Sequence, residues 1–162
     1  MRTLSVFIVS IALSGLATTS VAQTVQTKFS CSAVSDDGGD KITLADSGEI
    51  NLNGSEIKTF RWESALYRST HGFDCSIDDE DGLQAEVQNE TAQPAWRIGL
   101  IDGRAARAKR GYNFERGVNC TIRVERDADS IKLRPTCPAL CGSRANFSEI
   151  VIDLHDGTCR YE

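Results

Sequence analysis

The chain has few of the residues from which catalytic sites are usually built. It contains only two histidines, His71 and His155, in 162 residues, and no G-x-S-x-G segment of the kind that presents a nucleophilic serine in hydrolases. His155 lies between Ser148 and Asp156, but Asp156 is better explained by a turn with Gly157. The sequence therefore predicts neither an enzyme nor a bound cofactor.

The ligand spacing of a metal site is also missing. Structural zinc sites combine paired C-x2-4-C segments or add histidines, whereas this chain has a single C-x3-C segment, Cys137–Cys141. Two acidic segments, 36–40 and 78–82, have the oxygen-rich composition that calcium prefers. Aligning Gly82 with the invariant glycine of an EF-hand puts Ile77 at the first ligand position. We interpret both acidic segments as solvated turns and predict no metal.

Long apolar runs are absent except at the start of the chain. A basic residue precedes 13 mostly apolar residues, Leu4–Leu16, and small residues follow, with Ser20 and Ala22 suited to cleavage before Gln23. This is the three-part pattern of a secretory signal peptide. The apolar run is shorter than the about 20 residues that a transmembrane helix needs. We predict a signal peptide over 1–22 and a periplasmic or secreted protein that does not span the membrane after signal removal.

A net positive charge is missing as well. Residues 23–162 contain 17 basic and 23 acidic residues, a net charge of −6. This charge argues against nucleic acid as a partner and fits a basic protein partner attracted by the opposite field. The length is that of one domain with a hydrophobic core, and no repeat or linker divides it. The sequence therefore predicts a single domain over 23–162.

Apolar and polar residues alternate through most of this domain. Such alternation buries one face of each strand in an antiparallel sheet, and Asn53-Gly54 and Asp156-Gly157 favour hairpin turns between strands. We predict an all-β fold, a single antiparallel β-barrel or sandwich of about eight or nine strands. The alternating runs are 29–33, 42–44, 50–52, 83–87, 96–100, 120–124, 131–133 and 150–154.

One segment departs from this alternation. Residues 103–111 are rich in alanine and arginine and are compatible with one short helix near 103–110 or with a long exposed loop. Arginine and aromatic side chains are common at binding hot spots, so this basic segment is either an anion-binding surface or a solvated segment paired with local acids. The candidate binding residues are Arg104, Arg107, Lys109, Arg110 and Tyr112.

Six cysteines follow the signal segment, and this number favours disulfide bonds formed in an oxidising compartment. Cys137 and Cys141 lie four residues apart, which suits two bridges from one loop to different strands better than a bridge between them. Each bridge is expected to stabilise the fold by about 2–4 kcal/mol, mainly by restricting the unfolded chain. The predicted pairs are Cys31–Cys75, Cys120–Cys137 and Cys141–Cys159.

Residues 137–147, CPALCGSRANF, resemble the C-x3-CG-x-RA-x-F signature near the end of small proteobacterial periplasmic proteins. Some of those proteins are grouped with or fused to LprI-type lysozyme inhibitors. This chain lacks the helical, cysteine-containing module of the LprI family and the S-G-x-x-Y loop of the C-type lysozyme inhibitors, so no inhibitory residue is carried over. The resemblance implies a periplasmic, disulfide-bonded architecture. We interpret the signature as structural, with Phe147 filling the end of a barrel.

These observations favour an exported binding protein that recognises a cell-envelope protein or glycan. Its most specific form is an inhibitor of lysozyme-type muramidases, in which a loop occludes the enzyme's cleft. Trp62 and Trp96 are interpreted as core residues, with an exposed platform for stacking sugars as the alternative. Two other functions stay open: a structural or stress-resistance envelope protein, and a small envelope hydrolase.

Overall fold

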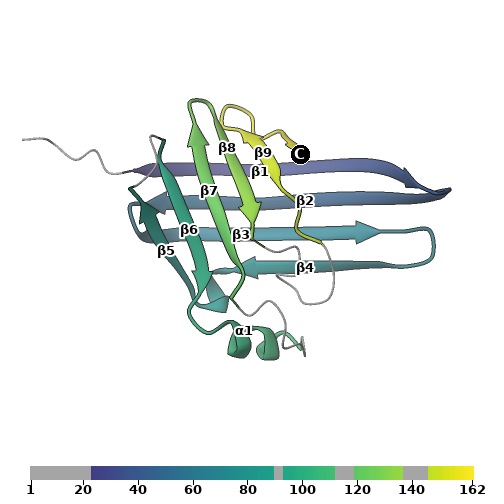
Figure 1. Cartoon of the computed structure of the whole chain (residues 1–162), viewed down its shortest axis with the longest axis horizontal. Helices are drawn as coiled ribbons and strands as arrows, with labels where there is room; N and C mark the ends of the chain where they lie inside the picture. The colour runs from purple at the N-terminus through teal and green to yellow at the C-terminus, as the bar shows by residue number, and fades with distance from the viewer. Residues whose placement is uncertain (1–22, 90–92, 112–118, 137–145) are drawn as a thin grey trace, which may run out of the picture.

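The computed structural model confirms the all-β fold and describes residues 23–89, 93–111, 119–136 and 146–162 (Figure 1). Within these residues the chain forms ten strands, one short α-helix and one 3₁₀ turn. The sequence predictions that lie outside the described residues are those for the signal peptide over 1–22 and for Tyr112, Cys137 and Cys141.

The strands form two antiparallel sheets, in each of which strands that are consecutive in the chain pair with one another. The first sheet has the order β1-β2-β3-β4 and contains β1 (Thr24–Asp37), β2 (Asp40–Asn53), β3 (Glu56–Tyr67) and β4 (Gly72–Asp78). The second has the order β10-β9-β8-β7-β6-β5 and contains β5 (Leu83–Gln88), β6 (Ala95–Leu100), β7 (Thr121–Asp127), β8 (Ser130–Pro135), β9 (Ile150–Asp153) and β10 (Cys159–Tyr161).

The two predicted turn dipeptides both lie between paired strands. Gly54 has a φ of 56° in the β2–β3 turn, and Gly157 has a φ of 73° between β9 and β10. Side chains disfavour this left-handed conformation, which explains the glycines. Gly157 is also required by packing, because a Cβ atom there would lie 2.1 Å from the carbonyl oxygen of Lys28.

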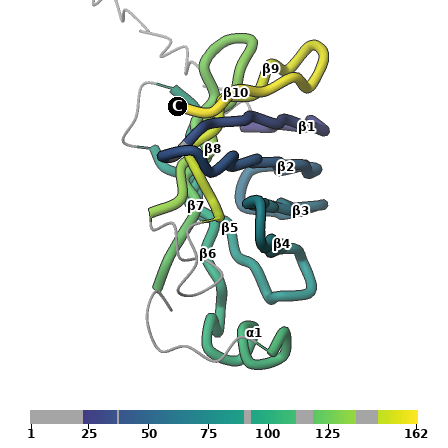
Figure 2. The backbone as a smooth tube through the Cα atoms, turned by 90° about the vertical axis from the view of Figure 1, so that its right-hand side faces the viewer, coloured from purple at the N-terminus to yellow at the C-terminus, as the bar shows by residue number. Residues whose placement is uncertain are grey.

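The two sheets pack face to face as the layers of a sandwich. Figure 1 shows β6–β9 running across the direction of β1–β4, and Figure 2 shows β1–β4 as a separate layer. Within the described residues the two sheets do not close on each other, so the sandwich prediction is confirmed and the barrel alternative is wrong. No helix in this part of the chain is long and apolar enough to cross a bilayer.

One hydrophobic core fills the space between the layers. Trp62 and Trp96 are both fully buried in it, so the core interpretation is confirmed and the sugar platform is wrong. Phe147 is also buried, and its ring meets Trp62 edge to face with centroids 4.8 Å apart. The other large, fully buried side chains are Phe60, Ile50, Leu52, Ile98, Ile122, Ile131, Leu133, Ile150 and Ile152.

A buried polar cluster lies within this core. Asp46 is only 3% exposed, and its carboxylate accepts hydrogen bonds from Trp62 Nε1 and from the Tyr161 hydroxyl, both at 2.7 Å. Burial raises the pKa of Asp46, and burial together with the Asp46 carboxylate raises the pKa of Tyr161. Nearby, Ser64 Oγ donates to the carbonyl of Asn146 at 2.9 Å, and Asn146 Nδ2 donates back to the Ser64 carbonyl at 3.0 Å. The cluster ties the C-terminal strand to the four-stranded sheet.

A disulfide bond joins the two sheets, between Cys31 of β1 and Cys159 of β10. Beside it, Ser30 and Thr158 form an isolated parallel β-bridge. The two cysteines are 128 residues apart in the sequence, but their strands are adjacent in space. The predicted pairs Cys31–Cys75 and Cys141–Cys159 are therefore wrong, because the fold places β1 beside β10.

Cys75 and Cys120 are also disulfide-bonded. No cysteine among the described residues is a free thiol, which confirms that these four cysteines serve as crosslinks. The pairing of Cys120 with Cys137 stays a prediction, because Cys137 lies outside the described residues.

Candidate functional site

The predicted basic segment forms helix α1 (Gly103–Lys109), which confirms the short-helix alternative. Asp102 caps the helix by accepting a hydrogen bond from Ala105 N at 2.9 Å. Arg110, at the end of the helix, is ion-paired with Asp78 and Asp81 and donates to Ser76 Oγ at 2.7 Å. The hydrogen bonds that Arg110 donates, first to Asp81, raise the pKa of its guanidinium. Arg110 thus attaches the helix to the acidic turn after β4.

The other candidate binding residues differ in their exposure. Arg107 is buried at 3% exposure, and desolvation lowers its pKa. Arg104 and Lys109 are exposed to solvent. Tyr112 lies outside the described residues, so the structure leaves its predicted role untested.

The acidic segment 78–82 has structural contacts for most of its carboxylates. It contains the 3₁₀ turn η1 (Asp79–Asp81), which Asp78 caps by accepting from Glu80 N at 3.0 Å. Asp79 accepts from the backbone nitrogen of Phe60 at 2.9 Å, and Asp81 accepts from Arg110. Within the described residues, no group of His, Cys, Asp and Glu side chains could hold a metal ion. The acidic and basic segments, which sequence analysis treated separately, contact each other.

The histidine considered for a hydrolase is exposed. The His155 ring lies 3.1 Å from Asp153 Oδ1 and 3.9 Å from Asp129 Oδ1. Among the described residues, no serine or threonine hydroxyl forms a hydrogen bond with His155. This arrangement provides no activated serine.

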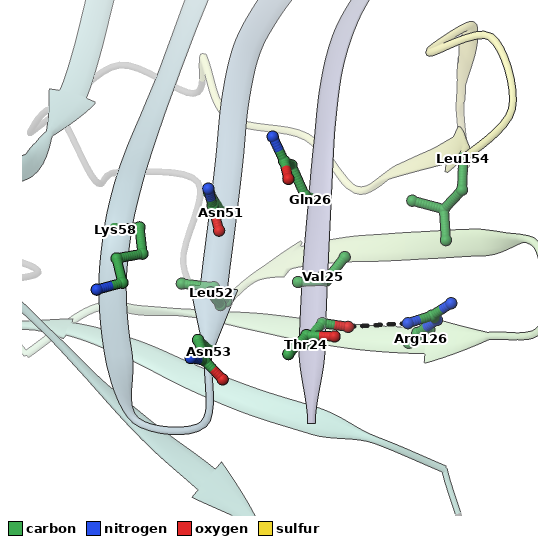
Figure 3. Close-up of a pocket in the computed structure, with 9 residues that line it drawn as sticks. All are labelled: Thr24, Val25, Gln26, Asn51, Leu52, Asn53, Lys58, Arg126 and Leu154. Atoms are coloured by element: carbon green, nitrogen blue, oxygen red, sulfur yellow. Dashed lines mark hydrogen bonds between the residues drawn. The ribbon is translucent and has the colours of Figure 1, made fainter. Parts of the chain in front are cut away.

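A hollow of about 630 Å³ lies at the Thr24 end of β1 (Figure 3). The two cationic side chains that line it, Arg126 and Lys58, both bind other residues of the chain. Arg126 Nη1 donates to the Thr24 carbonyl at 2.8 Å, and Lys58 is paired with Glu56 at 2.6 Å. Its remaining side chains are apolar or uncharged, so the hollow offers no uncompensated charge: Val25, Gln26, Asn51, Leu52, Asn53 and Leu154.

A second hollow, of about 390 Å³, lies on the outer face of the four-stranded sheet. This face points away from the core, because the residues that alternate with it, such as Cys31 and Ser64, are buried. Two cross-strand rows form the floor of the hollow, and most of their side chains are small. These rows are Ser32, Ala45, Ala65 and Asp74, and Ser30, Ser47, Glu63 and Ser76.

Exposed apolar side chains border the floor at one end. Val34, Thr43 and Tyr67 form the next cross-strand row, with Val34 67% and Tyr67 50% exposed. The Tyr67 ring lies over Gly72, where a Cβ atom would come 2.3 Å from the ring. Gly72 thus lets the aromatic ring lie along the sheet. We call this row and the two floor rows the acidic face.

The carboxylates of the acidic face differ in their partners. Glu63 accepts hydrogen bonds from Arg61 on the same strand and, at 3.4 Å, from Ser47 Oγ. Asp74 is exposed and makes no ion pair or side-chain hydrogen bond with any residue that the structure describes. Asp74 is therefore available to a cation outside the chain.

The negative charge is concentrated in the first part of the domain sequence. Residues 23–82, which contain β1–β4 and η1, have twelve acidic and five basic residues, a net charge of −7. Residues 83–162 have eleven acidic and twelve basic residues, a net charge of +1. The net charge of −6 predicted to attract a basic partner thus comes from residues 23–82, within which Asp46 is buried in the core and Asp78 and Asp81 are paired with Arg110.

Sequence reasoning missed Val34, Tyr67 and Asp74 as candidate site residues. It listed no alternating run over β3, because the core-facing series Phe60, Trp62, Ser64 is interrupted by a serine. Had β3 been assigned, Tyr67 would have stood out as a large side chain on the solvent-facing positions. No feature of the sequence distinguishes Asp74 from the other exposed acidic residues.

No protein-family model matches the chain, and no curated protein or solved structure is significantly similar to it. A function for the acidic face therefore rests on its shape, its charge and its exposed side chains.

Proposed function

We propose that this chain is an exported envelope protein that binds a basic protein partner through the acidic face. The most specific form of the proposal is inhibition of a lysozyme-type muramidase. The observation that carries it is the hollow of about 390 Å³, whose lining includes an exposed tyrosine, Tyr67, and an exposed carboxylate, Asp74, without an ion pair among the described residues. Disulfide-bonded cysteines are compatible with an oxidising compartment outside the cytoplasm.

The composition of the face suits a protein contact. Tyrosine supplies a large contact area at a low cost in side-chain entropy and is enriched at binding hot spots. The small residues of the floor, such as Ala45 and Ala65, let a protruding side chain approach the sheet backbone. An arginine or lysine that enters the hollow meets Asp74 and packs its aliphatic stem against Tyr67. The Asp74 carboxylate on this face and the net charge of −7 over residues 23–82 attract a basic partner to this part of the protein.

An inhibition assay with the oxidised mature chain, residues 23–162, tests the proposal. We expect micromolar protein to slow lysis of cell walls by at least one of the C-, G- and I-type lysozymes. The double substitution Tyr67→Ala and Asp74→Asn is expected to weaken inhibition at least tenfold, since it removes both the aromatic contact and the unpaired carboxylate. Binding measured by calorimetry separates loss of affinity from loss of inhibition.

A matched control uses the other exposed positions of the chain. Ile101 is 69% exposed and Asp129 has a side chain that is 79% exposed, and both lie away from the acidic face. The double substitution Ile101→Ala and Asp129→Asn is expected to leave inhibition unchanged. Absence of any effect on all three lysozyme types would remove the inhibitor form of the proposal. Equal losses in the two double variants would remove the acidic face as the site.

A further inference from the structure

Three arginines lie side by side on the outer face of the six-stranded sheet. Arg97 of β6, Arg123 of β7 and Arg134 of β8 occupy directly paired cross-strand positions. Side chains in such positions are about 5 Å apart at their Cβ atoms, and like charges there destabilise a sheet. The arrangement therefore places three cationic groups side by side at a cost, each of them next to a glutamate.

Each arginine is ion-paired, but not through all of its donors. The pairs are Arg97 with Glu86, Arg123 with Glu125 and Arg134 with Glu149. All three pairs use Nε, and Arg97 and Arg134 also use Nη2. The Nη1 atom of each has no hydrogen-bond partner among the residues that the structure describes. The three side chains are 54%, 44% and 46% exposed, so each guanidinium can donate to a second anion.

A hollow of about 190 Å³ lies next to Arg97, opened by Gly99 on the same strand. Gly99 does not have a positive φ, and a Cβ atom there would meet only Thr121 Cγ2, at 3.5 Å. Neither the backbone nor packing therefore requires glycine at this position. A glycine inside a strand weakens it and often marks close approach of a ligand. The hollow has the volume of about six water molecules.

The lining of this hollow is polar. Gln84, Asn119 and Thr121 contribute amide and hydroxyl groups. Arg97, the first arginine of the row, also lines the hollow together with Glu86, its ion-pair partner. Amides and hydroxyls are suited to the hydroxyl groups of a sugar, whereas guanidinium groups are suited to a carboxylate or phosphate. A chain-like ligand that carries both hydroxyl groups and anionic groups can form hydrogen bonds in the hollow and with the three arginines at the same time.

We propose that the outer face of the six-stranded sheet binds an acidic oligosaccharide. One sugar ring occupies the hollow at Gly99, and the anionic groups of the following sugars lie along Arg97, Arg123 and Arg134. This site is separate from the acidic face and does not depend on the function proposed for that face. A chain with both sites could be held on an acidic glycan while its opposite sheet engages a basic protein.

Calorimetric titration of the oxidised mature chain tests this site. The probes are a hexamer of galacturonic acid, neutral maltohexaose and inorganic tripolyphosphate. We expect the acidic hexamer to bind, to weaken as salt is raised from 50 to 200 mM, and to exceed maltohexaose by at least tenfold. Arg123→Gln is expected to reduce affinity about tenfold or more, the range for hydrogen bonds to charged groups. Gly99→Val is expected to reduce it similarly by filling the hollow, without lowering the melting temperature.

Arg61→Gln is the matched control. Arg61 and Glu63 form an ion pair two residues apart on β3, as Arg123 and Glu125 do on β7, but on the other sheet. This variant is expected to bind the hexamer as the unmodified chain does. The proposal is overturned if the hexamer does not bind, or if Arg61→Gln and Arg123→Gln weaken it equally. The assignment to a sugar would be overturned if tripolyphosphate bound as tightly as the hexamer and Gly99→Val did not change its affinity.

Discussion

Arg110 holds Asp81 with two hydrogen bonds, from Nε to Oδ1 at 2.5 Å and from Nη2 to Oδ2 at 2.9 Å. The Asp81 side chain is 4% exposed, whereas that of Arg110 is 25% exposed. The pair lies where α1 meets the turn after β4. One arginine of the candidate binding segment is thus paired with local acids and fixes the position of its own helix.

Replacing Arg110 should destabilise the fold. Arg110→Gln is expected to lower the free energy of unfolding by about 2 kcal/mol, because the buried Asp81 carboxylate loses its cation. The value is below that for a fully buried pair, since solvent reaches Arg110. Urea denaturation measures the change. Arg104→Gln, on the exposed side of the same helix, should stay within about 0.5 kcal/mol of the unmodified chain. Equal effects of the two substitutions would contradict the structural role.

The buried carboxyl of Asp46 should make stability depend on pH. Burial raises the pKa of Asp46 in the folded state. Between the unfolded and the folded pKa, the folded state therefore holds a proton that the unfolded state has released. Stability contributed by this group is present below the unfolded pKa, about 4, and is lost as the pH rises through the folded pKa. Each unit of the raised pKa corresponds to about 1.4 kcal/mol. Asp46→Asn should remove this loss.

The difference in unfolding free energy between Asp46→Asn and the unmodified chain isolates this effect from other carboxylates. We expect it to increase in favour of the variant between pH 4 and pH 8, as followed by urea denaturation. Asp129→Asn, at an exposed position, is the control and should give a constant difference. Parallel curves for Asp46→Asn and the unmodified chain would show that Asp46 ionises alike in both states.

Two glycines with similar backbone conformations should respond differently to alanine. Gly38 has a φ of 64° with nothing near its missing side chain, whereas Gly157 has a φ of 73° and lies against the Lys28 carbonyl. Gly38→Ala should cost about 1 kcal/mol, the cost of the left-handed conformation alone. Gly157→Ala should cost about 2 kcal/mol more, because the turn must move away from β1. Thermal unfolding of both variants checks this order, and equal costs would contradict the close contact.

Removal of the Cys31–Cys159 bond should weaken the sandwich. The double substitution Cys31→Ala and Cys159→Ala is expected to lower the free energy of unfolding by about 2–4 kcal/mol, since it frees a long loop in the unfolded chain. Urea denaturation without reductant measures this. Peptide mapping of the unmodified chain should find Cys31 joined to Cys159. An unchanged midpoint, or Cys31 joined elsewhere, would contradict the assignment.

The layered all-β fold could be predicted because its information is local. Alternation along β7 and β8 and glycine at the hairpin turns depend only on neighbouring residues. Trp62 and Trp96 could be assigned to the core because large apolar groups rarely stay exposed. Strand β3 was missed because Ser64 faces the core, where Asn146, 82 residues away, satisfies it.

The candidate sites could not be predicted because they depend on register between strands. Arg97, Arg123 and Arg134 form a row only because β6, β7 and β8 align them. Likewise, Tyr67 and Asp74 border one hollow through the pairing of β3 with β4. The basic segment was conspicuous in the sequence, yet Arg107 is buried and Arg110 is ion-paired within the chain. Composition identifies charge, whereas only the fold reveals whether another part of the chain neutralises it.

The bond between Cys31 and Cys159 also determines how the protein behaves once it has been nicked. It connects the first and last strands, so that a protease cutting any one loop between them leaves both fragments covalently attached. Such nicked molecules migrate as intact protein on a gel until a reducing agent separates the pieces.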